Sequence, residues 1–210
     1  MPESKRHLEL RTLLYLVLGT FRHEHSIGCD QFVYWDPTDP ASCVAPDAFV
    51  HLSVPDSDFR SWKTWERGIP ELAVEIVSYS DAPSAPWDVK LQRYQELGVQ
   101  ELVRFDPEGT PERRLRIWDR IGGELVERKN ADRFCNVLNL YWVVAPARNV
   151  SAALRLARDA EGRDLVPTPE EAEAKAREAE AKAREAEAKA REAAERRVAE
   201  LEALLRLQKD

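Results

Sequence analysis

Apolar residues recur at helical spacing close to the start of the chain. A helix spanning 8–21 would place one set of them on a single side, where they could pack against a core. That set is Leu10, Leu13, Leu14, Val17 and Phe21. The run 12–18 follows a charged start, as a secretory signal would, but no small-residue cleavage site comes after it. A buried amphipathic helix is therefore the preferred interpretation.

Short apolar runs separated by turn residues predict strands after this helix. Two are expected at 31–35 and 44–52, the second with Pro46 near its start, where a missing N–H is tolerated. The most strand-like stretch is 72–77, which is apolar on both faces apart from Glu75. Continuous apolar sequence is typical of a central strand that is covered on both sides.

The second half of the domain continues the alternation of helix and strand. We expect a short helix or irregular segment at 57–68, a helix at 88–97 that ends before Gly98, and a strand at 99–105. The Gly122-Gly123 pair lies between two further apolar runs and predicts a β-hairpin. This order predicts an α/β domain over 1–166, with a mixed central sheet flanked by helices.

The segment 167–210 has a different composition. Its Glu-Ala-Glu-Ala-Lys-Ala-Arg unit occurs at a period of seven, and acidic residues precede basic ones by four positions. Such pairs stabilise a helix by roughly 0.2–0.5 kcal/mol each, and alanine has the highest helix propensity. A long helix is predicted. Two alternatives stay open: a free-standing charged helix, or a coiled coil held by leucines near 198–207 that would form a homo-oligomer.

Composition narrows the class of protein. The chain of 210 residues has a formal charge of −7, so it lacks the overall basic character of many nucleic-acid-binding proteins, although a local basic cleft is compatible with it. Its three cysteines form no CxxC motif. This favours a reducing, cytoplasmic location. No run is apolar and long enough to span a bilayer.

Three ionisable residues stand in unusual places. Asp47 follows Pro46 at a strand, Glu75 interrupts the central apolar run, and Lys90 begins the next helix. A carboxylate in a buried strand is costly unless it is paired or binds a metal ion. Two carboxylates can hold Mg²⁺, which activates water and neutralises charge in phosphodiester hydrolysis, and a lysine can stabilise the transition state.

The surrounding motifs resemble a known family. Asp47 lies in Ala-Pro-Asp-Ala-Phe-Val, Glu75 in Ile-Pro-Glu-Leu-Ala-Val-Glu-Ile-Val-Ser, and Lys90 in Asp-Val-Lys, followed by Tyr94 and Leu-Gly-Val-Gln-Glu-Leu. In this order, across roughly 25–166, they resemble the Uma-two putative restriction endonuclease family of the PD-(D/E)XK nuclease superfamily. The resemblance implies a restriction-endonuclease-like fold and a DNA endonuclease that depends on Mg²⁺ or Mn²⁺.

The resemblance also implies roles for individual residues. Asp47 and Glu75 would bind the metal ion, the Ile76 carbonyl would be a further ligand, and Lys90 would be the catalytic lysine. The superfamily places its lysine two residues after the acid, but that position is Val77 here. In this chain the lysine would come from the following helix instead.

Structural alternatives remain for each residue. Asp47 could cap a turn, Glu75 and Lys90 could form a buried salt bridge, and Lys90 alone could be a solvated helix residue. In that case the chain would be a catalytically silent binding or assembly module that oligomerises through its C-terminal helix.

Overall fold

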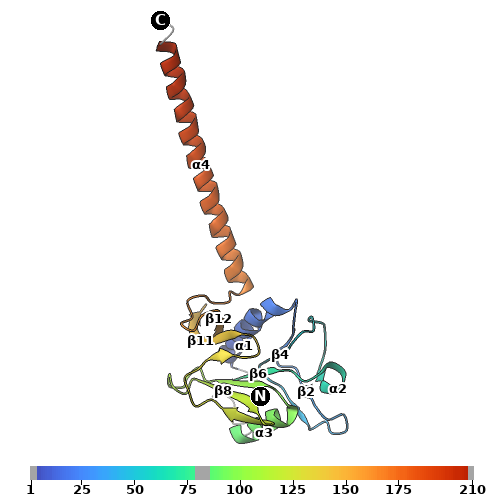
Figure 1. Cartoon of the computed structure of the whole chain (residues 1–210). Helices are drawn as coiled ribbons and strands as arrows, with labels where there is room; N and C mark the ends of the chain where they lie inside the picture. The colour runs from blue at the N-terminus through green and yellow to red at the C-terminus, as the bar shows by residue number, and fades with distance from the viewer. Residues whose placement is uncertain (1–3, 79–85, 208–210) are drawn as a thin grey trace. The chain divides into compact units, whose positions relative to one another are not determined.

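The computed structural model describes residues 4–78 and 86–207. The chain divides into two units, Met1–Thr168 and Pro169–Asp210. The first contains the sheets and the hydrophobic core, and the second is helical (Figure 1).

A six-stranded mixed sheet forms the centre of the first unit. In spatial order its strands are β1 (Ser26–Gly28), β4 (Ala48–His51), β6 (Leu72–Ile76), β7 (Glu101–Phe105), β8 (Leu115–Ile121) and β9 (Glu124–Glu127). Strands β6 and β7 are parallel, and the other neighbours are antiparallel. The mixed central sheet predicted from the sequence is therefore confirmed.

Helices cover the two faces of this sheet (Figure 1). Helix α1 (Lys5–Leu18), which continues into the 3₁₀ turn η1 (Gly19–Phe21), buries its leucines on one face. Helix α3 (Trp87–Leu97) buries Tyr94 and Leu97 on the other. A four-residue helix, α2 (Thr64–Arg67), precedes β6 in the chain.

Two small sheets complete the unit. One contains β10 (Phe134–Cys135), β11 (Leu140–Ala147) and β12 (Val150–Ala157), and β12 packs on α1. The other contains β3 (Cys43–Val44), β2 (Val33–Tyr34) and β5 (Trp62–Lys63).

Local turn signals predict several boundaries correctly. Helix α3 ends at Gly98, whose φ of 99° is favourable for glycine. The β8–β9 hairpin turns at Gly122 and Gly123, with φ values of 62° and 93°. Two consecutive positive φ values are typical of a type I′ turn, which matches the twist of the flanking strands.

Other boundaries differ from the predictions. The expected strand at 44–52 is wrong, because the chain leaves the ladder at 45–47 and forms two strands, β3 and β4, in different sheets. Pro46 has no N–H to donate and restricts the residue before it, which explains the break. The first helix begins earlier than expected, because Ser4 Oγ accepts a hydrogen bond from the His7 N–H at 3.1 Å and caps it.

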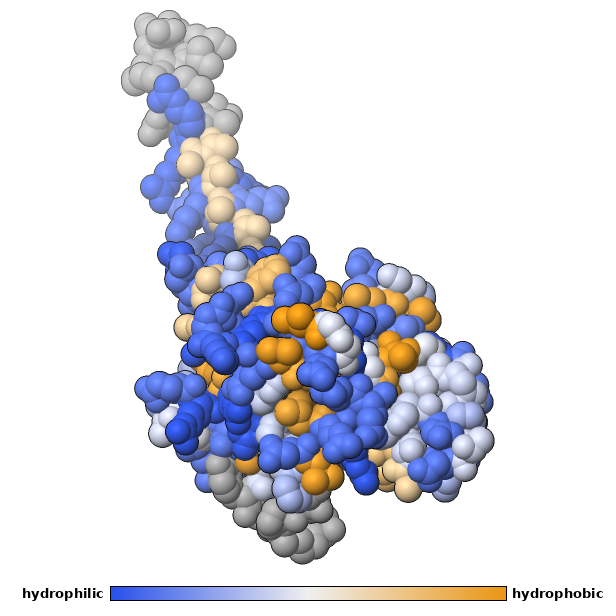
Figure 2. Space-filling model, turned by 60° about the horizontal axis from the view of Figure 1, so that its bottom comes forward, coloured by the Kyte–Doolittle hydropathy of each residue, from blue (hydrophilic) through white to orange (hydrophobic). Residues whose placement is uncertain are grey.

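The second unit is helix α4 (Pro169–Leu207). Ion pairs at the predicted i,i+4 spacing include Glu178–Lys182 at 2.5 Å and Glu185–Lys189 at 2.6 Å. Every side chain of 169–197 is exposed, and a pale stripe of weakly apolar residues is visible along the helix in Figure 2. No described helix is long and apolar enough to cross a membrane.

Candidate metal and catalytic site

The structure brings the three predicted site residues together. Asp47 immediately precedes β4, Glu75 lies near the end of β6, and Lys90 lies in the first turn of α3. Strands β4 and β6 are antiparallel neighbours in which Ala48 pairs with Val74. Asp47, just before Ala48, and Glu75, just after Val74, therefore lie at the same end of this strand pair. The Lys90 ammonium lies 2.5 Å from Glu75 Oε2. The break at Pro46 thus leaves Asp47 beside the central strand but outside the ladder.

The Asp47 carboxylate is held from two directions. Its Oδ2 accepts a hydrogen bond from the Ile76 N–H at 2.7 Å, and its Oδ1 lies 2.7 Å from His7 Nε2. The residue is buried, with 7% of its surface exposed. The contact with Ile76 fixes Asp47 to the strand that carries Glu75, whereas His7 connects it to α1. Asp47 does not cap a turn here.

The Glu75 carboxylate has a different environment. One oxygen accepts a hydrogen bond from the Tyr94 hydroxyl and the other from Lys90, both at 2.5 Å. Burial raises the pKa of Glu75, the Lys90 charge opposes that rise, and the nearby Asp47 charge adds to it. Burial and the Glu75 charge raise the pKa of Tyr94 well above its ordinary value, so Tyr94 is a neutral donor.

Lys90 is the most accessible member of the group. Its side chain is 35% exposed, compared with 6% for the Glu75 side chain. One end of the Glu75–Lys90 pair is therefore buried and the other reaches solvent. A cavity of about 200 Å³ also opens beside His7 and Val77, close to the residues that hold Asp47.

Sequence reasoning did not assign a role to His7 or Tyr94. Tyr94 is four positions after Lys90 in α3, a spacing that places two residues on one side of a helix. This signal could have identified it. His7 is 40 positions from Asp47 and meets it only through the packing of α1, so no local pattern indicates the contact.

The residues present fit a small divalent cation. Two carboxylates supply hard oxygen ligands, and Mg²⁺ is commonly held by one or two carboxylates together with water and substrate phosphate. The repulsion that Asp47 adds at Glu75 would be relieved by a cation between them. Within 4–78 and 86–207, no cluster of three or more His, Cys, Asp or Glu side chains forms a fuller metal cage.

Comparisons with known proteins found a family match and a similar solved structure. The Uma2 family model, described as "Putative restriction endonuclease", matches residues 1–140. A crystal structure from Anabaena variabilis, titled a putative nuclease belonging to DUF820, is similar over 72% of this chain and 76% of that chain, with 12% sequence identity and a TM-score of 0.43. No curated protein matches the chain.

Proposed function

The chain belongs to the Uma2 family of putative restriction endonucleases, and we propose that it is an endonuclease that hydrolyses DNA phosphodiester bonds with Mg²⁺ or Mn²⁺. The observation that carries this proposal is the convergence of Asp47 and Glu75 with Lys90 at the end of two neighbouring strands. Two carboxylates and one ammonium group supply the charges that metal-dependent phosphodiester hydrolysis requires.

Asp47 and Glu75 would hold the cation, and the Ile76 carbonyl is a further ligand by resemblance to the family. The cation would activate water and neutralise charge on the phosphate. Hydrogen bonds from Ile76 N–H and Tyr94 keep one oxygen of each carboxylate oriented. This fixes the two side chains before substrate binds, which reduces the cost of ordering them.

Lys90 has a separate role in the proposal. Its ammonium pairs with Glu75, and a cation held by that carboxylate would leave the ammonium available to a substrate phosphate. A cation close to the phosphoryl oxygens stabilises the negative charge that accumulates during attack. Lys90 therefore acts on the reaction, whereas Tyr94 and His7 position the carboxylates.

Incubation of plasmid DNA with the full-length protein and Mg²⁺ or Mn²⁺ tests this proposal. We expect nicked or linear product from the wild type and from Glu24→Gln, which removes one exposed charge, and none from Glu75→Ala. Equal cleavage by wild type and Glu75→Ala would refute the site.

The ion pair supports a second candidate function. Glu75 and Lys90 in direct contact at 2.5 Å also form the structural salt bridge expected of a silent nuclease-fold module. Such a module would use the exposed helix α4 to form a homo-oligomer. Absence of both cleavage and calorimetric binding of Mn²⁺ would favour this candidate over the enzyme.

A further inference from the structure

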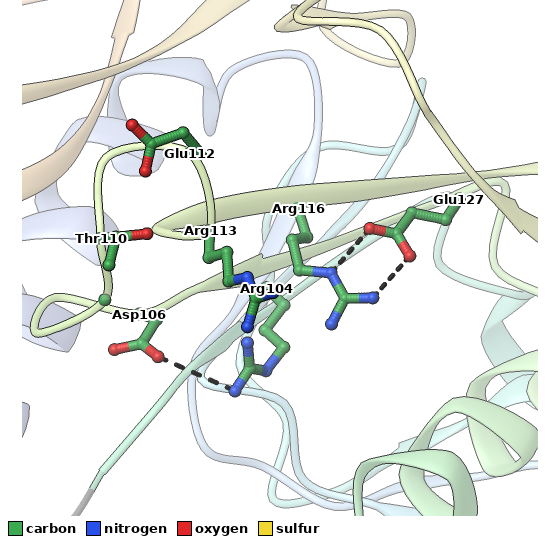
Figure 3. Close-up of a pocket in the computed structure, with 8 residues that line it drawn as sticks. Arg104, Asp106, Thr110, Glu112, Arg113, Arg116 and Glu127 are labelled. Carbon is green, nitrogen blue, oxygen red and sulfur yellow. Dashed lines mark hydrogen bonds and ion pairs between the residues drawn. The ribbon is translucent and has the colours of Figure 1, made fainter.

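A cavity of about 570 Å³ lies at one end of strands β7 and β8 and contains three arginines, Arg104, Arg113 and Arg116. Figure 3 shows their guanidinium groups directed toward a common region, with Glu127 beside Arg116 and with Glu112 turned away. The gathering of like charges is notable in a chain whose formal net charge is −7. Like charges at close range are costly unless anions offset them.

The carboxylates around the cavity do not offset these charges equally. Arg116 forms a two-pronged pair with Glu127 at 2.5 and 2.7 Å, so both of these groups are satisfied. Among the described carboxylates, Arg104 forms one long ion pair, with Asp106 at 3.9 Å, and 20% of its side chain is exposed. One oxygen of Asp106 also accepts a hydrogen bond from the Glu108 N–H at 3.1 Å.

Arg113 is the most available of the three. It is exposed, and within the described residues no ion pair or side-chain hydrogen bond of its guanidinium is found. Glu112, the acidic residue nearest to Arg113 in the sequence, is not seen to pair with it among the described residues. Hydrogen bonds from its own backbone N–H and from Thr110 lower the pKa of Glu112, and its carboxylate is turned away from the arginines in Figure 3. The cavity therefore offers one weakly paired and one free guanidinium.

Aromatic rings hold two of the guanidinium groups in place. The Arg104 guanidinium lies 5.2 Å from the centre of the Trp87 ring, and that of Arg116 lies 4.9 Å from the Trp118 ring. The two indole rings are 5.1 Å apart. Stacking of this kind reduces the entropy lost when an arginine binds an anion.

The sheet register connects this cavity to the candidate metal site. Arg104 is the direct partner of Glu75 on the neighbouring strand, and Arg116 is the partner of Arg104 on the next. Direct partners in a sheet point to the same face, and strands are about 4.8 Å apart. Arg104 and Arg116 therefore lie about 5 and 10 Å from Glu75 along one face. DNA advances about 3.4 Å per nucleotide of each strand, so a phosphate near the reacting one falls within this range.

We propose that Arg104 and Arg113 form a subsite for a DNA backbone phosphate next to the phosphate that is cleaved, with the Arg116–Glu127 pair lining one side of it. This inference rests on the proposed endonuclease function and names its substrate contact. A second cavity, of about 650 Å³, shares Glu112, Arg116 and Glu127 with the first and adds Lys129, Asp132 and Arg133. The backbone would continue along this side of the protein.

Binding of a fluorescein-labelled DNA duplex to the full-length protein tests the subsite. Fluorescence anisotropy is measured at several NaCl concentrations, with Ca²⁺ in place of Mg²⁺, and cleavage is measured separately with Mg²⁺. The variants are Arg113→Ala, Arg113→Lys and Arg104→Gln. The matched control is Arg163→Ala, which removes an exposed arginine paired with Glu161 and Asp159 in the turn after β12. Because Arg113 is exposed, Arg113→Ala does not threaten folding.

We expect Arg113→Ala and Arg104→Gln each to weaken binding about tenfold and to reduce the slope of log K against log salt by about 1. Arg113→Lys restores the slope but only part of the affinity, because lysine lacks the guanidinium fork. Arg163→Ala stays within about twofold of wild type. If wild type binds and cleaves DNA while both variants match the control, the subsite is refuted and the endonuclease function stands. If wild type neither binds nor cleaves DNA, both proposals are refuted.

Discussion

Replacing Glu75 by glutamine separates the metal-binding role of this residue from its structural role. Glutamine has nearly the same shape and can still accept the Tyr94 hydrogen bond, which is 2.5 Å long in the wild type. It removes the negative charge that faces Lys90 and Asp47. The substitution therefore tests the charge and leaves the packing of β6 and α3 in place.

The expected effect on stability in the absence of metal is small. A hydrogen bond to a charged group contributes about 1.5–3 kcal/mol and one to a neutral group about 0.5–1.5 kcal/mol, so each weakened contact costs roughly 1–1.5 kcal/mol. Burial is the main reason that the pKa of Glu75 is raised, so the buried charge is itself unfavourable. Glutamine has no charge to bury, and this gain offsets the cost of the weakened contacts. We expect a melting temperature within about 4 °C of wild type, since 1 kcal/mol shifts a domain of this size by about 2–4 °C.

The expected effect with metal is larger. A cation at about 100 times its Kd stabilises the folded state by about 2.7 kcal/mol, which raises the melting temperature by about 5–11 °C. Differential scanning fluorimetry with and without Mn²⁺ measures this rise. We expect it in wild type and in Glu24→Gln but not in Glu75→Gln. A full Mn²⁺-dependent rise in Glu75→Gln would show that Glu75 does not bind the metal and would refute the assignment.

Four further predictions concern separate parts of the chain. Lys90→Met should lower plasmid cleavage by about 10²–10³-fold while the Mn²⁺-dependent rise in melting temperature persists; loss of both would make Lys90 structural. Cleavage should decline as pH falls through the raised pKa of Glu75, because only the ionised carboxylate binds metal, and a pH–rate profile that is flat across the acid range would contradict this. Glu101→Ala should destabilise the fold by about 3–5 kcal/mol in urea denaturation, because it leaves Trp142 Nε1 and the Asn136 N–H without their buried acceptor; a change under about 1 kcal/mol would disprove that role. Full-length protein should self-associate in sedimentation, whereas 1–168 should be monomeric, and identical states would rule out assembly through α4.

The parts of the fold that the sequence predicts are those encoded by local signals. The apolar run at 72–77 becomes β6, and Gly98 ends α3, because burial and backbone freedom act within a few residues. The strand expected at 44–52 fails because the apolar pattern continues through Pro46, whereas the hydrogen-bond ladder does not. The pattern of apolar side chains carries no information about backbone donors. The missing donor is indicated by the proline itself.

The site could be predicted only in part for a similar reason. Asp47, Glu75 and Lys90 are unusual in their local context, so each is visible in the sequence. The contacts that hold them span longer distances: Asp47 accepts from Ile76 N–H 29 positions away and meets His7 40 positions away. Those contacts depend on how elements pack, which no local pattern contains.

The structure also distinguishes the environments of two buried acids, which the sequence alone does not do. Glu75 and Glu101 lie on neighbouring strands, are 5% and 1% exposed, and both have a raised pKa caused mainly by burial. Glu101 accepts from Trp142 Nε1 at 3.0 Å and from the Asn136 N–H at 2.8 Å, donors that cannot leave without disturbing the core.

Glu75 differs because one of its two donors can leave. Lys90 extends from the first turn of α3 with 35% of its side chain exposed, so its ammonium can move into solvent at little cost. The carboxylate oxygen that it releases would otherwise be buried and unpaired, which favours a replacement cation. A buried acid with a replaceable partner can exchange that partner for a metal ion, whereas an acid with fixed partners can only support the fold. On this distinction we propose the chemistry for Glu75 and a structural role for Glu101.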